Sequence, residues 1–91
     1  MQSGYNARVD RLNAIRLLKA LVAAGANARV PMASDWVHKM ALREMSLQGT
    51  DLASAIAYAE GEGWVADIPT RKGCIFLTRT GELVAQANHS K

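Results

Sequence analysis

The apolar residues in the first quarter of the chain follow the spacing of an α-helix. They recur at intervals of three and four residues, at Leu12, Ile15, Leu18 and Val22. Asn6 is suited to cap the start of this helix, and Gly25 is suited to end it. The pattern therefore predicts a helix from about Ala7 to Ala24.

Two further leucines, Leu17 and Leu21, lie outside this apolar stripe, so the helix is apolar around much of its circumference. Such a helix is wrapped on two sides by neighbouring elements, or one of its flanks meets another subunit. A homodimer through Leu17 and Leu21 is therefore one of two expectations for this flank.

The next segment combines a short extended stretch with a second helix. Pro31 disfavours helix at the residue before it and cannot donate to a strand ladder, so a short edge strand is expected within Ala28–Met32. Ser34 is expected to cap a helix that ends near Met45. The side of this helix expected to be buried carries Trp36, Val37, Met40 and Ala41.

After a short turn at 46–49, Thr50 is expected to cap a third helix, which Gly63 would end in a left-handed conformation. Its core-facing residues would be Leu52, Ala55, Ile56 and Ala59. The opposite side would present Ala53, Ser54, Ala57 and Tyr58. This outer side is small and almost uncharged.

Beyond Gly63 the period of the apolar residues changes from that of a helix to that of a strand. The runs Trp64–Ile68 and Cys74–Thr78 predict a β-hairpin, and Arg71 and Lys72 lie at its tip. Thr78 is suited to cap a short helix at 81–87. We expect one α+β domain over 1–91, with 1–6 and 88–91 frayed at its ends.

Two short stretches carry a resemblance to a known superfamily. Residues 55–65 end the third helix with a small or apolar pair, an acidic run, a glycine and two apolar residues. Phe76-Leu77-Thr78-Arg79-Thr80-Gly81 follows about ten residues later as aromatic-Leu-Thr-x-x-Gly. In this order the chain resembles the winged helix-turn-helix superfamily. The resemblance implies a three-helix core followed by a β-hairpin wing and a short C-terminal helix, and double-stranded DNA as the partner.

Charge along the chain agrees with this implication. The net charge is +3; residues 1–67 carry seven Lys or Arg and seven Asp or Glu, so the excess lies in 68–91. At the hairpin tip Arg71 and Lys72 are suited to phosphate contact, and Lys39 and Arg43, one helical turn apart, to backbone contact. The candidates for base contact are Gln48, Thr50, Ser54 and Tyr58. For each cation, an ordinary solvated position is the alternative.

The expected function is therefore that of a small DNA-binding transcriptional regulator, acting as a dimer. Asp51, Glu60 and Glu62 on the alanine-rich third helix would repel phosphates. That feature supports an alternative, in which the winged-helix domain binds another protein and no DNA.

Other function classes find little support in the residues. With one cysteine, Cys74, no disulfide forms within the chain, and His38 and His89 are too poorly accompanied to suggest a metal site. No glycine-rich nucleotide loop or paired titratable residues indicate an enzyme or a cofactor. The longest apolar run, Ala20–Ala24, is too short to span a membrane. Met1–Asn6 lacks the features of a signal peptide, so a cytoplasmic location is expected.

Overall fold

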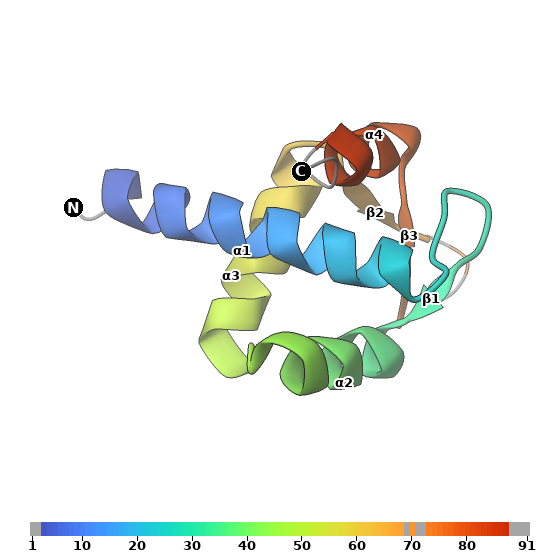
Figure 1. Ribbon diagram of the computed structural model, residues 1–91, viewed down its shortest axis with the longest axis horizontal. Helices are drawn as coiled ribbons and strands as arrows, with labels where there is room; N and C mark the ends of the chain where they lie inside the picture. Colours follow the sequence, from blue (N-terminus) through green and yellow to red (C-terminus); the bar gives the residue numbers. More distant parts are fainter. Residues whose placement is uncertain (1–2, 69, 71–72, 88–91) are drawn as a thin grey trace.

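The computed structural model describes the backbone of residues 3–68, 70 and 73–87, and the side chains among them from residue 8 onward. The described residues form an α+β fold of four helices and a three-stranded antiparallel sheet (Figure 1). In chain order the elements are α1 (Ser3–Ala23), β1 (Met32–Ala33), α2 (Ser34–Met45), α3 (Gly49–Gly61), β2 (Val65–Asp67), β3 (Cys74–Leu77) and α4 (Arg79–Ala87).

Helix α1 lies across the molecule and packs against α2, α3 and α4 (Figure 1). Because neighbours cover it on more than one side, the buried stripe is broader than the apolar spacing suggested and is rotated around the helix. Its fully buried members are Ala14, Leu17, Leu18 and Leu21. Leu12, which was expected in the core, is 57% exposed, whereas Ile15 and Val22 are half-buried.

This packing corrects the expected dimer contact. Leu17 is 3% exposed and Leu21 is 1% exposed, and both belong to the core of their own subunit. Neither side chain is available to a second copy. Of the two explanations for the broad apolar surface of α1, wrapping by neighbouring elements is the one the structure supports.

The ends of α1 are set by two different features. The helix begins at Ser3, before the start expected near Ala7, and its N-terminal part projects beyond the other elements (Figure 1). It ends at Ala23, and Gly25 then adopts a φ of +103°, a conformation that glycine tolerates without strain. The amide of Ala26 donates to the carbonyl oxygen of Leu21 at 2.9 Å, which closes the helix end as predicted.

Strand β1 lies at one edge of the sheet and β2 at the other, with β3 between them. Met32 pairs with Ile75 in the β1–β3 register, and Val65 pairs with Leu77 in the β2–β3 register. The predicted hairpin is therefore confirmed. The edge strand is present but lies later than expected: it consists of Met32 and Ala33, and of the expected range Ala28–Met32 only Met32 belongs to it.

Three of the expected helix caps are wrong. Asn6 lies within α1, which begins at Ser3. Ala33 occupies the N-cap position of α2 and Gln48 that of α3, and neither helix start has a side-chain cap. The reason at α2 is that β1 runs directly into the helix, so that the amide of Ser34 is bonded to the carbonyl oxygen of Gly73 at 2.7 Å. The cap expected at Thr78 is confirmed: its Oγ1 accepts the amide of Gly81 at 3.0 Å.

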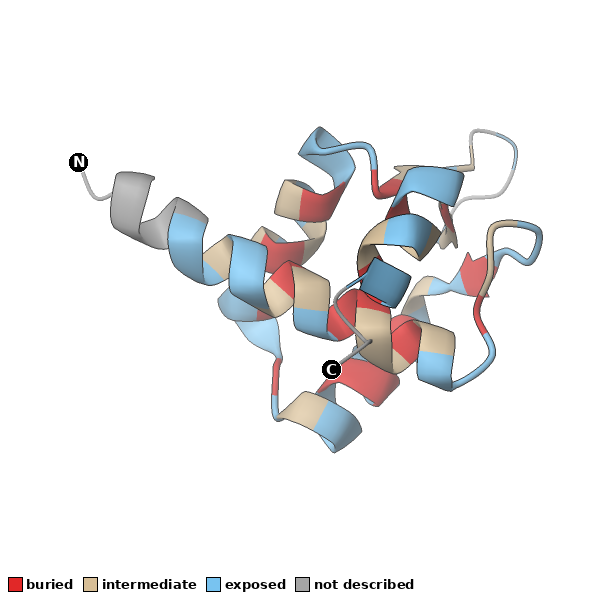
Figure 2. Cartoon of the chain, turned by 45° about the horizontal axis from the view of Figure 1, so that its top comes forward, coloured by how far each residue is buried: buried red, intermediate tan, exposed pale blue. Residues whose placement is uncertain are grey.

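The core lies where α1 meets α2, α3 and the sheet (Figure 2). Leu18, Val37, Ala41, Ala55 and Leu77 are completely inaccessible to solvent. Trp36 is the exception on α2: it was expected inside but is 37% exposed. Among the described residues, no helix combines the length and the apolar character needed to cross a membrane.

Candidate nucleic-acid interface

A tight turn joins α2 to α3 and fixes how these two helices are presented. Ser46 ends α2 in the left-handed region, with a φ of 54°. Its amide donates to the carbonyl oxygen of Leu42, and the amide of Leu47 donates to that of Ala41. The Leu47 side chain is 7% exposed and anchors the turn in the core. The turn between α2 and α3 is thus held by backbone bonds and one apolar side chain.

On α2, Lys39 and Arg43 lie on the side opposite the buried residues and are both exposed. The Nε atom of Arg43 lies 3.3 Å from a carboxylate oxygen of Glu44. The Arg43 side chain is 72% exposed and the Glu44 side chain is 50% exposed. Such exposed ion pairs are weak and exchange readily. Both cations therefore remain accessible to an anionic partner.

The four base-contact candidates on or before α3 separate into two groups. Gln48 and Thr50 are exposed at the start of the helix. Ser54 and Tyr58 are half-buried. The Tyr58 ring packs against Trp64 with 5.7 Å between ring centres, and Arg11 of α1 lies 5.9 Å above the same tryptophan. Tyr58 was expected on the outer side of α3; it is instead partly buried and packs against the core.

The hairpin loop lies between β2 and β3, and β2 begins four residues after the end of α3. The amide of Ile68 bonds to the carbonyl oxygen of Cys74 at 3.3 Å, and Gly73 has a φ of +80° at the base of β3. Arg71 and Lys72 lie outside the described residues. Their expected contact with phosphate therefore stays a prediction from the sequence.

A concavity of about 300 Å³ lies between the start of α2, the outer side of α3 and the sheet. Ala53 and Ala57 form its small-residue wall on α3, whereas its polar groups come from Ser34, His38, Glu60 and Asp67. Nδ1 of His38 is 2.8 Å from the carbonyl oxygen of Ser34, one turn back along α2. Lys39 and Arg43 do not line this hollow.

Glu60 and Asp67 make the hollow acidic. Burial raises the pKa of Glu60 above its ordinary value of 4.5, and the negative charge of Asp67 and a hydrogen bond with it raise this pKa further. Two carboxyl groups that share a site resist double ionisation. A DNA phosphate next to them would meet the same repulsion.

Asp67 is the residue that sequence reasoning missed. The acidic character of Glu60 was visible in the sequence, but its partner lies on β2 and is brought to it only by the return of the chain after Gly63. No local pattern links the two positions. The sequence offers one signal for this pair: Asp67 is an acidic residue at an outward-facing position of the first hairpin strand.

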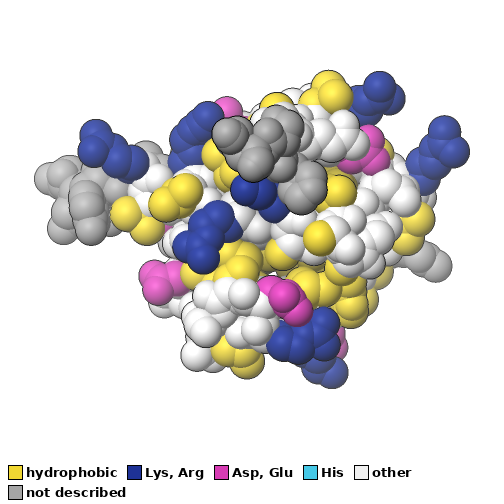
Figure 3. Space-filling model, in the orientation of Figure 1, with side chains coloured by type: hydrophobic (Ala, Val, Ile, Leu, Met, Phe, Trp, Pro, Cys, Tyr) yellow, Lys and Arg dark blue, Asp and Glu magenta, His cyan; other side chains and the backbone are white. Residues whose placement is uncertain are grey.

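Cations on α1 form a second charged feature, outside the buried stripe. Arg8, Arg11 and Arg16 are exposed and Lys19 is half-buried, whereas Asp10 is the single acid of the helix. Figure 3 shows Lys and Arg side chains spread over this side of the molecule, with apolar groups between them. Within the described part of the chain the sole ion pair is that of Arg43 and Glu44, so the α1 cations are not neutralised there.

Comparison with protein-family models, with curated proteins and with solved structures gave no match.

Proposed function

We propose that this chain is a winged-helix protein that binds double-stranded DNA and regulates transcription. The observation that carries the proposal is the placement of a helix-turn-helix unit, α2–α3, between β1 and the β2–β3 hairpin. The sheet order β1-β3-β2 brings the strand before the unit and the hairpin after it into one sheet. In the proposal, the β2–β3 hairpin acts as the wing of the domain.

In this proposal the phosphate contacts come from Lys39 and Arg43 on α2 and from Arg71 and Lys72 in the loop. The start of α3, with Gln48 and Thr50, approaches base edges in the major groove. The carboxyl groups of Glu60 and Asp67 restrict contact at the other end of α3, since they disfavour nearby phosphate. Backbone contacts therefore contribute more to affinity than base contacts do.

Dimer formation through Leu17 and Leu21 is not part of the proposal, because both side chains lie in the core. Each domain is proposed to bind DNA through its own cations. With about four phosphates neutralised, the logarithm of the binding constant falls with the logarithm of salt concentration with a slope of about −3.6.

The test is fluorescence anisotropy of a labelled random duplex, titrated with protein from low to moderate salt. Arg71→Glu with Lys72→Glu should abolish binding and leave the circular dichroism spectrum unchanged. Lys39→Glu should weaken binding and reduce the salt slope by about 1. The matched control is Arg29→Glu, an exposed cation in the loop before β1. Binding that does not depend on salt and is unaffected by both the Arg71→Glu/Lys72→Glu variant and Lys39→Glu would refute the proposal.

A second candidate function is binding of another protein without DNA. The acidic concavity beside an alanine-lined α3 favours it, because such a surface accommodates a cationic or small side chain better than a phosphate. Glu60→Gln separates the two functions. It should strengthen binding of duplex DNA if α3 faces DNA, and should weaken binding of a partner that pairs with the carboxylate.

A further inference from the structure

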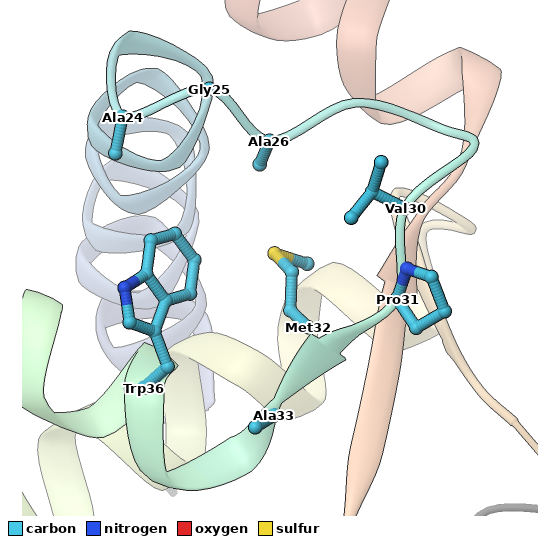
Figure 4. A pocket seen from close by; sticks show the side chains of 8 residues that line it. All are labelled: Ala24, Gly25, Ala26, Val30, Pro31, Met32, Ala33 and Trp36. Carbon is cyan, nitrogen blue, oxygen red and sulfur yellow. The ribbon is translucent and has the colours of Figure 1, made fainter.

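A second hollow, of about 350 Å³, lies on another part of the molecule, between the end of α1, the loop that follows it, β1 and the first turn of α2. Figure 4 shows the side chains that surround it. The six-membered ring of Trp36 faces Met32 across the hollow, Val30 and Pro31 lie on the far side, and Ala24 points towards the tryptophan from above. Met32 is 3% exposed, so the hollow reaches the core.

The walls of this hollow are held in place by backbone hydrogen bonds. The amide of Gly25 donates to the carbonyl oxygen of Val22 at 3.0 Å, which orders the turn at the end of α1. Farther along the loop, the amide of Ala28 donates to Glu82 of α4 at 2.6 Å. On the other side β1 is bonded into the sheet. Sites for small molecules are commonly formed in advance in this way.

All the residues that line the hollow are uncharged: Ala24, Gly25, Ala26, Val30, Pro31, Met32, Ala33 and Trp36. A charged ligand would lose its hydration there without gaining a partner. Trp36 and Val30 are 37% and 49% exposed, so a ligand that covers them removes apolar surface from water. The lining therefore suits a neutral, apolar ligand. Because the ring of Trp36 forms one wall of the hollow, a ligand with an aromatic ring gains a ring–ring contact as well.

The size and rim of the hollow favour a small molecule over a protein. Its volume falls at the lower end of the range of about 300–1,000 Å³ for ligand sites. Arg29 and Asp35, which adjoin the lining residues in the chain, are charged and exposed, so the apolar surface is interrupted there. A stable protein contact needs on the order of 1,000 Å² of continuous surface.

We propose that the hollow between the end of α1, β1 and Trp36 is a binding site for a small neutral aromatic molecule. This site is independent of the proposed DNA contact, since its lining residues include none of the candidates for that contact.

Indole is the probe, and the methionine methyl groups provide the readout. The chain has four methionines. In a methyl-labelled protein, indole should shift the Met32 signal in a saturable way, with a dissociation constant on the order of 1 mM or below. The Met40 signal should stay in place, because Met40 does not line the hollow. Indole-3-carboxylate, its charged relative, should bind at least tenfold more weakly.

Two alanine variants locate the site. Ala24→Phe places a ring in the hollow and should weaken indole binding at least tenfold. Ala23→Phe is the matched control: it adds the same ring at an exposed position one residue earlier, and Ala23 does not line the hollow. Unchanged Met40 shifts in both variants confirm that the fold is kept.

Three results would overturn the proposal. The first is the absence of a saturable Met32 shift up to the solubility limit of indole. The second is an equal effect of the two alanine variants. The third is self-association, seen by sedimentation, that indole reverses, because it would identify a second copy of the chain as the occupant.

Discussion

The hydroxyl oxygen of Thr78 lies 3.0 Å from the carbonyl oxygen of Trp64, and the backbone amide of Thr78 donates to that same carbonyl at 2.9 Å. The hydroxyl also donates to the carbonyl oxygen of Gly63 at 2.5 Å and accepts the amide of Gly81. One side chain thus joins the residues that follow α3 to the start of α4. The threonine of the Phe-Leu-Thr-x-x-Gly stretch has a structural role.

Replacing this hydroxyl by a methyl group should destabilise the fold. Thr78→Val preserves the shape of the side chain. It removes the cap of α4 and the hydrogen bonds of the hydroxyl to the carbonyl oxygens of Gly63 and Trp64. We expect a loss of about 1–2 kcal/mol in the free energy of unfolding, measured by urea titration. Thr80→Val is the matched control, because Thr80 is exposed in the same helix. An equal effect of the two changes would contradict the role assigned to Thr78.

Gly81 is required by a close approach of backbone. A Cβ atom there would lie 2.2 Å from the carbonyl oxygen of Trp64 and 3.0 Å from a methyl group of Leu77. Gly81→Ala should therefore cost about 2 kcal/mol or more, because a backbone atom has to move. In Gly61→Ala, the control, the added Cβ meets nothing within 4 Å. This helical position should gain up to about 1 kcal/mol. Thermal unfolding of both variants distinguishes the two environments.

The core assignment of α1 predicts opposite outcomes for two of its leucines. Leu17→Ala should reduce the free energy of unfolding by about 2–5 kcal/mol, since it leaves a cavity in the core. Leu12→Ala should change it by no more than about 0.5 kcal/mol, because that side chain is mostly in water. Urea unfolding, with the molecular mass checked by sedimentation, measures both. If Leu17→Ala leaves the stability unchanged but changes the oligomeric mass, Leu17 lies at a contact between subunits and not in the core.

Stability should depend on the ionisation of Glu60. Its pKa is raised in the folded state, so the fold disfavours the charged form, and Glu60 lowers stability at pH values above this pKa. As the pH falls through the folded pKa towards 4.5, the unfavourable contribution disappears. Glu60→Gln should thus be more stable than the parent near neutral pH and equal to it below pH 4.5. Urea midpoints across this range measure the difference.

Glu62→Gln serves as the control for this pH dependence, because Glu62 is exposed at the end of the same helix. It should not reproduce the gain near neutral pH. A Glu60→Gln protein less stable than the parent at neutral pH would show that burial and the repulsion from Asp67 do not destabilise the charged form of Glu60.

The spacing of apolar residues predicts the helices and the hairpin because each element must bury one face. The spacing does not predict which face of α1 is buried, because two apolar stripes overlap on this helix. Leu17 is buried and Leu12 is exposed because of where the neighbouring elements cover the helix. The spacing also fails at the starts of α2 and α3, since Ala33 and Gln48 become caps through the path of the preceding chain. The exposed cations of α2 were predictable, whereas the Glu60–Asp67 pair depends on a tertiary approach between α3 and β2.

The two outer strands of the sheet have a consequence for behaviour in concentrated solution. β1 is two residues long and follows Pro31, and β2 is three residues long and ends in the exposed Asp67. Such short edge strands are poor templates for strand addition by a second molecule. In addition, β1 adjoins a residue that has no amide hydrogen, and β2 ends in a charged residue. The sheet should therefore resist edge-to-edge aggregation at neutral pH, and neutralising Asp67 would weaken this protection.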